Sequence, residues 1–272
     1  ALPALVNQLS SAGHLQAAQG ILTTDAIVKE AAVEARIGGR VVRLGGMAKG
    51  AGMIAPSMAT MLCVLTTDAA IERGLLREIV REAVARSFNR ISVDGDMSTN
   101  DCVFALANGC SGAVIRRGTP GATSFAAMAR GVTARLAYLL VKDGEGATRV
   151  ASIEVLGAQT GRQANACVRQ IATSSLVRTM LAGGDPNVGR IAASAGASGA
   201  RFDPDQLDIR IGGHPVVRRG VALRIGKALA KQLFAPKELT IQVRLHAGGA
   251  EAAMLACDLT EEYVRMNARY TT

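Results

Sequence analysis

A glycine pair flanked by alternating side chains most narrows the folds open to this chain. Residues 31–46, AAVEARIGGRVVRLGG, alternate apolar and polar residues on both sides of Gly38-Gly39, which predicts a β-hairpin with a two-residue turn. Residues 69–89 instead repeat apolar side chains such as Leu75 and Ile79 at helical spacing, which predicts an amphipathic helix. The two patterns together predict an α/β or α+β protein, and a composition of 49% hydrophobic residues without tryptophan agrees.

Further elements are predicted from apolar runs and from turn and capping residues. The expected strands are 60–65, 150–156, 207–211, 216–225, 238–245 and 252–258, the last two joined by the turn HAGGAE. The expected helices are a short one capped by Ser10 or Ser11 and ending near Gln19-Gly20, then 124–141, 163–180, and a last one capped by Thr260. ILTTDA at residues 21–26 recurs as VLTTDA at 64–69, and each copy is predicted to end a strand and cap a helix.

Two glycine-rich stretches mark expected loops in the second half of the chain. GGDPNVGR (183–190) and GASGARFDPDQ (196–206) are predicted to separate an N-terminal layer from a smaller C-terminal one. With 272 residues, the chain is long enough for one large domain or two modest ones.

The charge distribution and the length of the apolar runs limit the kinds of partner that this chain is expected to bind. The formal charge is +9, and its arginines are spread from Arg36 to Arg269 without interleaved aromatic side chains. This distribution favours a solvated surface, or attraction for small carboxylate substrates, over nucleic-acid binding. No apolar run reaches the roughly 18 residues that cross a bilayer, and nothing resembles a signal peptide. We therefore expect no nucleic acid and no membrane. The chain begins at Ala1 within a helix-like segment, and we expect the natural N-terminus to lie upstream.

Cysteine and histidine usage argues against metal centres and disulfides. The five cysteines are odd in number and form no CxxC pair, and the three histidines lie far apart without an HExxH motif. A disulfide framework or a zinc site is therefore not expected, and a reducing cytoplasm is the predicted compartment.

Two stretches imitate ligand-binding motifs without matching them. GMAKGAG, from Gly46 to Gly52, lacks the GxxxxGK[ST] order of a phosphate-binding loop. DGDMSTND, from Asp94 to Asp101, starts like a calcium loop, but Thr99 stands where that loop needs glycine, and its last ligand is missing. A tight turn that leads into the next element is the simpler interpretation of DGDMSTND.

Thr60 stands between a flexible glycine-rich approach and an apolar run. A threonine hydroxyl is a weak nucleophile unless a base lies beside it, and an N-terminal threonine supplies its own α-amine as that base. A nearby cation such as Lys49 would lower the pKa of that amine further. Cleavage between Ala59 and Thr60 would create such a residue, and Gly50, Gly52 and Pro56 give the chain the turns this needs. The local sequence alone favours the simpler interpretation, a β-branched residue that opens a strand.

Several segments together carry a resemblance that covers essentially the whole chain. They are, in order, ILTTD, GGMAKGAGMIAPSMATMLCVLTTDA, RSFNRISVDGDMSTND, VKDGEGATR, GGDPNVGR and the tail CDLTEEYVRMNARYTT. In content and order they closely resemble the ornithine acetyltransferase family, also called glutamate N-acetyltransferase or ArgJ. The resemblance implies a precursor that cleaves itself between Ala59 and Thr60, so that residues 1–59 end the α chain and 60–272 form the β chain.

The resemblance also implies the chemistry and its residues. Thr60 would take the acetyl group from N-acetylornithine and pass it to glutamate in a ping-pong exchange, in arginine biosynthesis and without cofactor or metal. Acetyl-CoA is a second possible donor in bifunctional members. The substrate-binding residues would be Thr23, Lys49, Thr60, Glu145, Asn267 and Thr272. Only 59 residues precede Thr60, so we expect the threonine-glycine pair of the oxyanion hole to lie upstream of this chain.

The implied fold is α/β, a layered αββα sandwich of the DmpA/ArgJ type with a smaller C-terminal α/β portion, assembled as α2β2. Two other functions stay open. An amidase or aminopeptidase would keep the Thr60 nucleophile but pass the acyl group to water. A non-catalytic basic binding protein would remain one uncut polypeptide.

Overall fold

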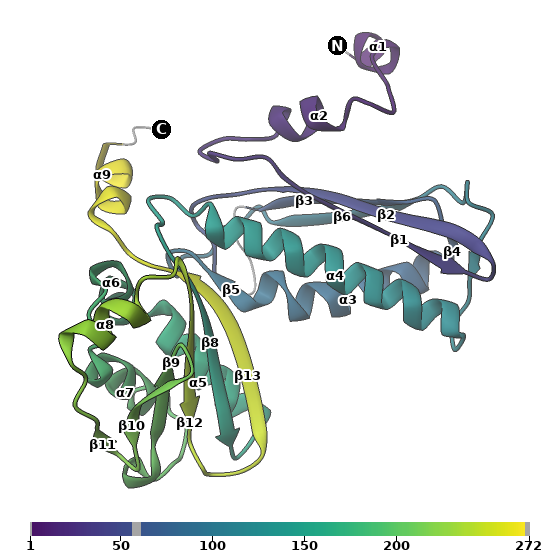
Figure 1. The fold of residues 1–272 in the computed structure, drawn as a ribbon. Coiled ribbons are helices and arrows are strands. Elements are labelled where there is room, and N and C mark those ends of the chain that lie inside the picture. Colours follow the sequence, from purple (N-terminus) through teal and green to yellow (C-terminus); the bar gives the residue numbers. More distant parts are fainter. Residues whose placement is uncertain (1, 56–60, 270–272) are drawn as a thin grey trace.

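The first sheet carries the predicted hairpin. The computed structural model describes residues 2–55 and 61–269. Four strands lie in the order β1-β2-β3-β6: β1 (Lys29–Ile37), β2 (Arg40–Lys49), β3 (Leu62–Thr67) and β6 (Cys102–Ala107) (Figure 1). Ile37 pairs with Arg40 across the turn, and Gly38 and Gly39 have φ angles of 58° and 79°. The predicted hairpin is confirmed, and its left-handed turn residues match the right-handed twist of the two strands that they join. β3 and β6 run parallel.

Two helices cover one face of this sheet, and both were predicted from the sequence as helices. They are α3 (Arg73–Arg86) and α4 (Pro120–Lys142). Leu75, Ile79 and Ala83 form the buried stripe of α3, but Ile71 is not helical. It belongs to β4 (Ala70–Ile71), which pairs with β7 (Val114–Ile115), because Glu72 caps the helix instead. A short 3₁₀ turn (Phe88–Arg90) and β5 (Ile91–Ser92) follow α3.

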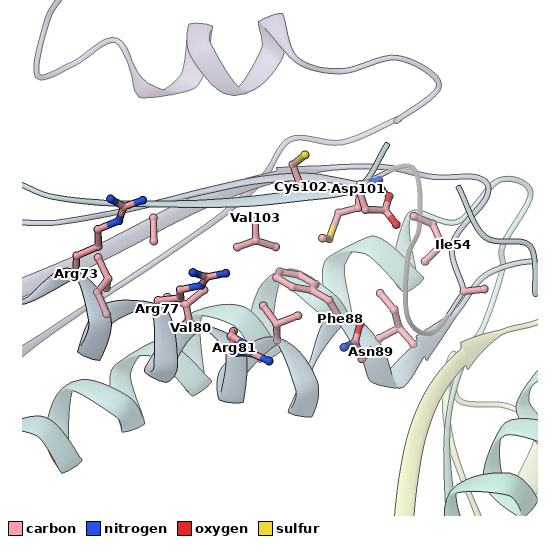
Figure 2. Close-up of a pocket in the computed structure, with 16 residues that line it drawn as sticks. Ile54, Arg73, Arg77, Val80, Arg81, Phe88, Asn89, Asp101, Cys102 and Val103 are labelled. Atoms are coloured by element: carbon pink, nitrogen blue, oxygen red, sulfur yellow. Dashed lines mark hydrogen bonds between the residues drawn. The ribbon is translucent and has the colours of Figure 1, made fainter. Parts of the chain in front are cut away.

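A cavity of about 640 Å³ opens between α3 and the strand β6 (Figure 2). On the side of the cavity formed by α3 lie three arginines, Arg73, Arg77 and Arg81. The apolar part of the cavity wall includes Phe88 and Val103. None of the described residues predicted to bind substrate lines this cavity.

The second sheet is mainly built from the C-terminal half. Its order is β11-β10-β9-β12-β8-β13-β5. The strands not yet given are β8 (Val150–Ala158), β9 (Asp208–Ile211), β10 (His214–Arg218), β11 (Val221–Ala222), β12 (Glu238–Arg244) and β13 (Ala250–Cys257). β8 pairs parallel with β12 and antiparallel with β13, while β5 joins the edge beside β13. Through β5, the first half of the chain contributes a strand to the second sheet.

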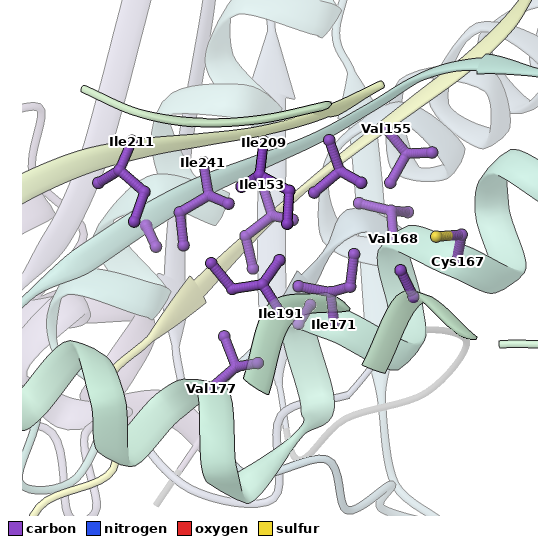
Figure 3. Close-up of a cluster of buried hydrophobic side chains, with 14 of the residues drawn as sticks. Ile153, Val155, Cys167, Val168, Ile171, Val177, Ile191, Ile209, Ile211 and Ile241 are labelled. Carbon is purple, nitrogen blue, oxygen red and sulfur yellow. The ribbon is translucent and has the colours of Figure 1, made fainter. Parts of the chain in front are cut away.

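An apolar core joins this sheet to its helices (Figure 3). The helices that contribute to this core are α5 (Gly161–Thr173), α6 (Ser175–Gly183), α7 (Val188–Gly196) and α8 (Lys227–Leu233). Ile153 and Ile241 from the sheet meet Ile171 from α5 and Ile191 from α7, and all four side chains are fully buried. The α/β class predicted from the sequence is confirmed.

Several predictions in this half are wrong. The helix expected at 163–180 is two helices, because Ser174 leaves helical geometry and caps α6 with its side chain. The strand expected at 216–225 is interrupted at Arg219-Gly220, where both residues have positive φ. The two glycine-rich loops lie inside the C-terminal unit, which begins at β8, and α7 starts within the first of them.

Three short helices complete the described chain: α1 (Leu2–Asn7), α2 (His14–Gly20) and α9 (Glu261–Arg269). The end of α2 is as predicted, but its cap is Gly13, and the Ser10 hydroxyl accepts from Ala12 instead. Neither TTD copy caps a helix. Among the helices of residues 2–55 and 61–269, none is long and apolar enough to cross a membrane.

Candidate active site

Four of the predicted substrate-binding residues line one cavity of about 460 Å³. Thr23 precedes β1, Lys49 ends β2, Glu145 lies in the turn after α4, and Asn267 lies on α9. The structure therefore brings together residues from four separate parts of the sequence. Ala59, Thr60 and Thr272 lie outside the described residues, so their predicted roles remain predictions.

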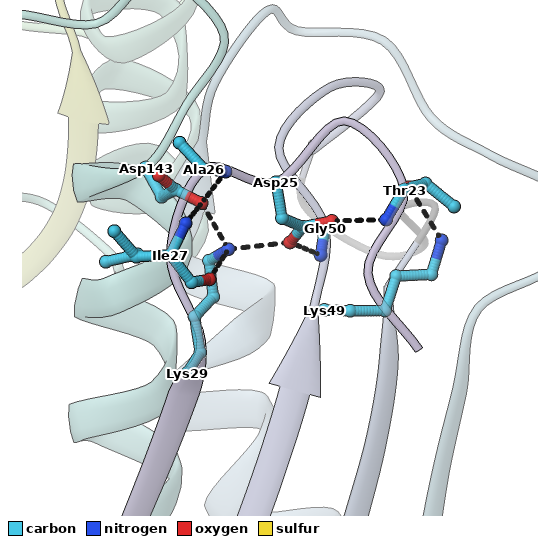
Figure 4. A network of polar contacts seen from close by, with 8 residues as sticks. All are labelled: Thr23, Asp25, Ala26, Ile27, Lys29, Lys49, Gly50 and Asp143. Atoms are coloured by element: carbon cyan, nitrogen blue, oxygen red, sulfur yellow. Dashed lines mark hydrogen bonds and ion pairs between the residues drawn. The ribbon is translucent and has the colours of Figure 1, made fainter. Parts of the chain in front are cut away.

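Asp25 fixes the backbone beside two of these residues (Figure 4). Its carboxylate accepts the N–H of Gly50 at 2.6 Å and the N–H of Thr23 at 3.2 Å. It also pairs with the Lys29 ammonium at 2.6 Å. Burial raises the pKa of Asp25, but the hydrogen bonds from Lys29, Gly50 and Thr23 outweigh it and hold the pKa below its usual value. Asp25 is thus a charged anchor for the backbone of Thr23 and Gly50, two residues that line the cavity.

Lys29 has a complete set of partners. Its side chain is 0% exposed, and its ammonium reaches Asp25, Asp143 at 2.5 Å and the Ile27 carbonyl at 3.3 Å. The Asp143 carboxylate also accepts the N–H groups of Ala26 and Ile27. Because Asp143 follows α4, this network ties the end of that helix to the start of β1 (Figure 4).

Lys49 is buried too, but it forms no such ion pairs with the residues that the structure describes. It is 7% exposed, and its ammonium donates to the Thr23 hydroxyl at 3.4 Å. No carboxylate in the part of the chain that the structure describes forms an ion pair with it. A buried cation is costly without a counter-charge. The cavity therefore presents a cation that an anionic ligand would stabilise.

Glu145 faces the cavity because its neighbours are small. Its N–H donates to the Ala51 carbonyl at 2.9 Å, and a Cβ on Gly52 would lie 2.8 Å from its carboxylate. Asn267 donates to the Glu145 carboxylate at 2.9 Å. Gly146 has φ +68°, and a Cβ there would lie 2.5 Å from the Tyr263 nitrogen, so glycine lets α9 pack against this turn. The predicted Thr260 cap of α9 is confirmed.

The rejected calcium-like motif also borders the cavity. Asp94 accepts the N–H groups of Met53 at 2.6 Å and Ile54 at 3.0 Å, and Asp101 accepts that of Met61 at 2.7 Å. Burial raises the pKa of both Asp94 and Asp101. The second oxygen of Asp101 is buried and has no donor among the residues described. The motif thus holds backbone in place, which spacing in the sequence did not indicate.

Charges of both signs line the cavity. Lys49 supplies a cation, whereas Asp94, Asp96 and Glu145 supply carboxylates. Burial, with the charges of these three acids, raises the pKa of Tyr263 to about 12, so its phenol keeps its proton at neutral pH. Such a site suits a small molecule that carries both a carboxylate and an ammonium group.

Metal-ligating side chains are not clustered in the described residues, where no group of three or more His, Cys, Asp or Glu is arranged to hold an ion. The five cysteines are free thiols, and none of them lines this cavity.

Comparison with known proteins decides the family. The model of the ArgJ family matches residues 1–272, the full chain. The chain belongs to the ArgJ family. The resemblance carried by the sequence motifs is confirmed.

Relatives in the ArgJ family are similar throughout. The arginine biosynthesis bifunctional protein ArgJ of a Synechococcus strain is 45% identical over 100% of this chain and 68% of its own length. That of Symbiobacterium thermophilum is 45% identical over 97% of this chain and 66% of its own. The chloroplastic ArgJ protein of rice is 45% identical over 98% of this chain and 60% of its own length. The chain thus spans about two thirds of the length of the relatives it matches.

A solved structure agrees with the fold. The crystal structure of the arginine biosynthesis bifunctional protein ArgJ from Bacillus halodurans matches with a TM-score of 0.72 and 34% identity, covering 76% of this chain and 98% of that one. The layered ArgJ-type fold implied by the sequence is therefore confirmed.

Proposed function

We propose that this chain belongs to an acetyltransferase that moves the acetyl group of N-acetylornithine to glutamate, in arginine biosynthesis. The observation that carries the proposal is Lys49, which is buried and without a carboxylate partner in the described chain, and which shares a cavity with Glu145. Each substrate bears a carboxylate for Lys49. Ornithine also bears an ammonium group for Glu145.

Thr60 is the proposed nucleophile, freed by cleavage after Ala59. Its hydroxyl attacks the acetyl carbonyl, the amide C–N bond breaks, and the hydroxyl proton passes through the α-amine to the departing ornithine amine. The amine of glutamate then attacks the acetyl ester, and the threonine oxygen leaves and recovers a proton. In this scheme Lys49, Thr23, Glu145, Asn267 and Thr272 bind and orient the substrates.

The two products of cleavage are proposed to act as one unit, with residues 1–59 in the α chain and 60–272 in the β chain. Thr23 and Lys49 precede the cleavage point, while Glu145 and Asn267 follow it. β2 and β3 also pair across it. An active cavity therefore needs both chains, and we propose an α2β2 assembly.

Acetyl-CoA is retained as a further acetyl donor in the proposal, because the relatives are named bifunctional. A reducing, cytoplasmic setting is proposed as well, and it suits the five free thiols.

Two measurements test the function. Intact mass of the purified full-length protein should show a chain beginning at Thr60, and Thr60→Ala should remain uncut. Ornithine release from N-acetylornithine should then depend on glutamate. Equal release without glutamate would identify a hydrolase, and an uncut, inactive parent protein would contradict the proposal altogether.

A further inference from the structure

One acidic loop holds the chain on both sides of the segment that contains Ala59 and Thr60. On the upstream side, Asp94 accepts the N–H groups of Met53 and Ile54 at 2.6 and 3.0 Å. On the downstream side, Asp101 accepts the N–H of Met61 at 2.7 Å. Figure 2 shows Asp101 and Ile54 at the same end of the α3–β6 cavity.

Backbone hydrogen bonds reinforce the contact at each side. The N–H of Val93 donates to the Ile54 carbonyl at 2.8 Å, and that of Cys102 donates to the Met61 carbonyl at 3.0 Å. Each side of the segment is therefore held by one carboxylate and one backbone bond. Hydrogen bonds to a carboxylate are stronger than neutral ones, so the carboxylates are the firmer part of this clamp.

The clamp is itself anchored to the C-terminal unit by Arg178. This side chain is 3% exposed, and its guanidinium donates to the carbonyls of Val93, Cys257 at 3.0 Å and Asp258 at 3.1 Å. Because Val93 directly precedes Asp94, the upstream side of the loop cannot shift without breaking a buried contact.

We propose that Asp94 and Asp101 are positioning residues for the cleavage between Ala59 and Thr60, and this rests on the proposed function. In that step the Thr60 hydroxyl attacks the Ala59 carbonyl carbon, the C–N bond breaks, and the hydroxyl proton passes to the departing nitrogen. Water then hydrolyses the ester, which leaves a carboxylate on Ala59 and a free amine on Thr60. Neither aspartate forms a covalent bond. Asp101 fixes the backbone of Met61, the residue directly after Thr60, and Asp94 fixes that of Ile54, five residues before Ala59. A misplacement of reacting groups by about 1 Å costs on the order of 10²-fold in rate.

Asp101 gives the sharper test, because a single oxygen of it accepts the backbone bond. Cleavage of the full-length protein is followed by intact mass over time. Asp101→Ala is expected to slow it by about 10- to 100-fold. Asp101→Asn keeps an accepting oxygen in the same place and is expected to stay within about threefold of the parent. Asp94→Ala should also be slow.

Asp68→Ala is the matched control. It removes a similar bond, from the Arg43 N–H at 2.8 Å, at the opposite end of the same sheet, and should cleave at the parent rate. Unfolding midpoints show that slow variants are folded. If Asp101→Ala does not fold, Asp101→Glu moves the accepting oxygen by one methylene and should also be slow.

The outcomes separate this inference from the proposed function. Cleavage of a folded Asp101→Ala or Asp101→Glu protein at the parent rate would overturn the positioning role alone. So would an Asp101→Asn protein as slow as Asp101→Ala, since the backbone bond would then not be what acts. A parent protein that never cleaves would overturn both the inference and the cleavage on which it rests.

Discussion

Two buried lysines at the same end of the β1–β2 hairpin are bound in opposite ways. Lys29 starts β1 and pairs with two carboxylates, whereas Lys49 ends β2 and donates only to the Thr23 hydroxyl among the described residues. The neighbour of Lys49, Ala48, pairs with Lys29 in the sheet. A completed ion network stabilises the architecture, and a buried cation that forms no ion pair with the described residues can bind an anionic ligand. At this end of the sheet, Lys29 therefore has a structural role, whereas Lys49 has a proposed role in ligand binding.

The C-terminal unit sharpens this contrast. Its core is almost entirely aliphatic (Figure 3), and its buried cation Arg178 is held by backbone carbonyls. The functional proposal therefore rests on charged side chains near the cavity, whereas the C-terminal core contributes mainly aliphatic packing.

The largest effect on stability is expected from Lys29→Met. The change leaves Asp25 and Asp143 buried without their cation, which costs about 3–5 kcal/mol. Urea unfolding measures the loss, and Lys237→Met, at an exposed lysine, should change stability by less than about 0.5 kcal/mol. Equal stability of the Lys29 and Lys237 variants would break the comparison.

Lys49→Met is expected to separate activity from stability. The value of kcat/KM for acetyl transfer should fall about 10- to 100-fold, because an ion pair with the substrate carboxylate is lost. The free energy of unfolding should stay equal or rise, since an apolar side chain replaces a buried charge that forms no ion pair with the described residues. A loss of stability like that of Lys29→Met would show that both lysines are structural.

Asp25→Asn tests the anchor through its pH dependence. A carboxyl whose pKa is lowered by folding stabilises the protein above its unfolded pKa, about 3.9, and that stability is lost as pH falls through the folded pKa. At pH 7 the variant should be about 1.5–3 kcal/mol less stable. The difference from the parent should shrink below about pH 4, and a difference that stays constant down to pH 2 would exclude the linkage.

The smallest effect is expected in the C-terminal core. Ile153→Val removes one fully buried methylene and should cost about 0.5–1.5 kcal/mol, with transfer unchanged. Altered kcat/KM in this variant, measured beside the parent, would show that the two regions are coupled.

Local patterns in the sequence predicted local structure well. The Gly38-Gly39 hairpin and helices α3 and α4 depend on turn chemistry and periodicity within short windows. The break at Ser174 was missed, because the apolar stripe continues from α5 into α6 across one capping residue.

Contacts between residues far apart in the sequence could not be predicted from local sequence patterns. The partner of Lys29 that completes its network, Asp143, lies 114 residues away. Thr23, Lys49, Glu145 and Asn267 were singled out from the family resemblance, and only the fold places them in one cavity.

Trapping the acetyl group tests the central claim most directly. The cleaved full-length protein is incubated with N-acetylornithine in the absence of glutamate, quenched, and mapped by peptide mass. We predict an acetyl group on the peptide that begins with Thr60, removed when glutamate is added. An acetyl group on any other residue, or none while ornithine is released, would contradict the account.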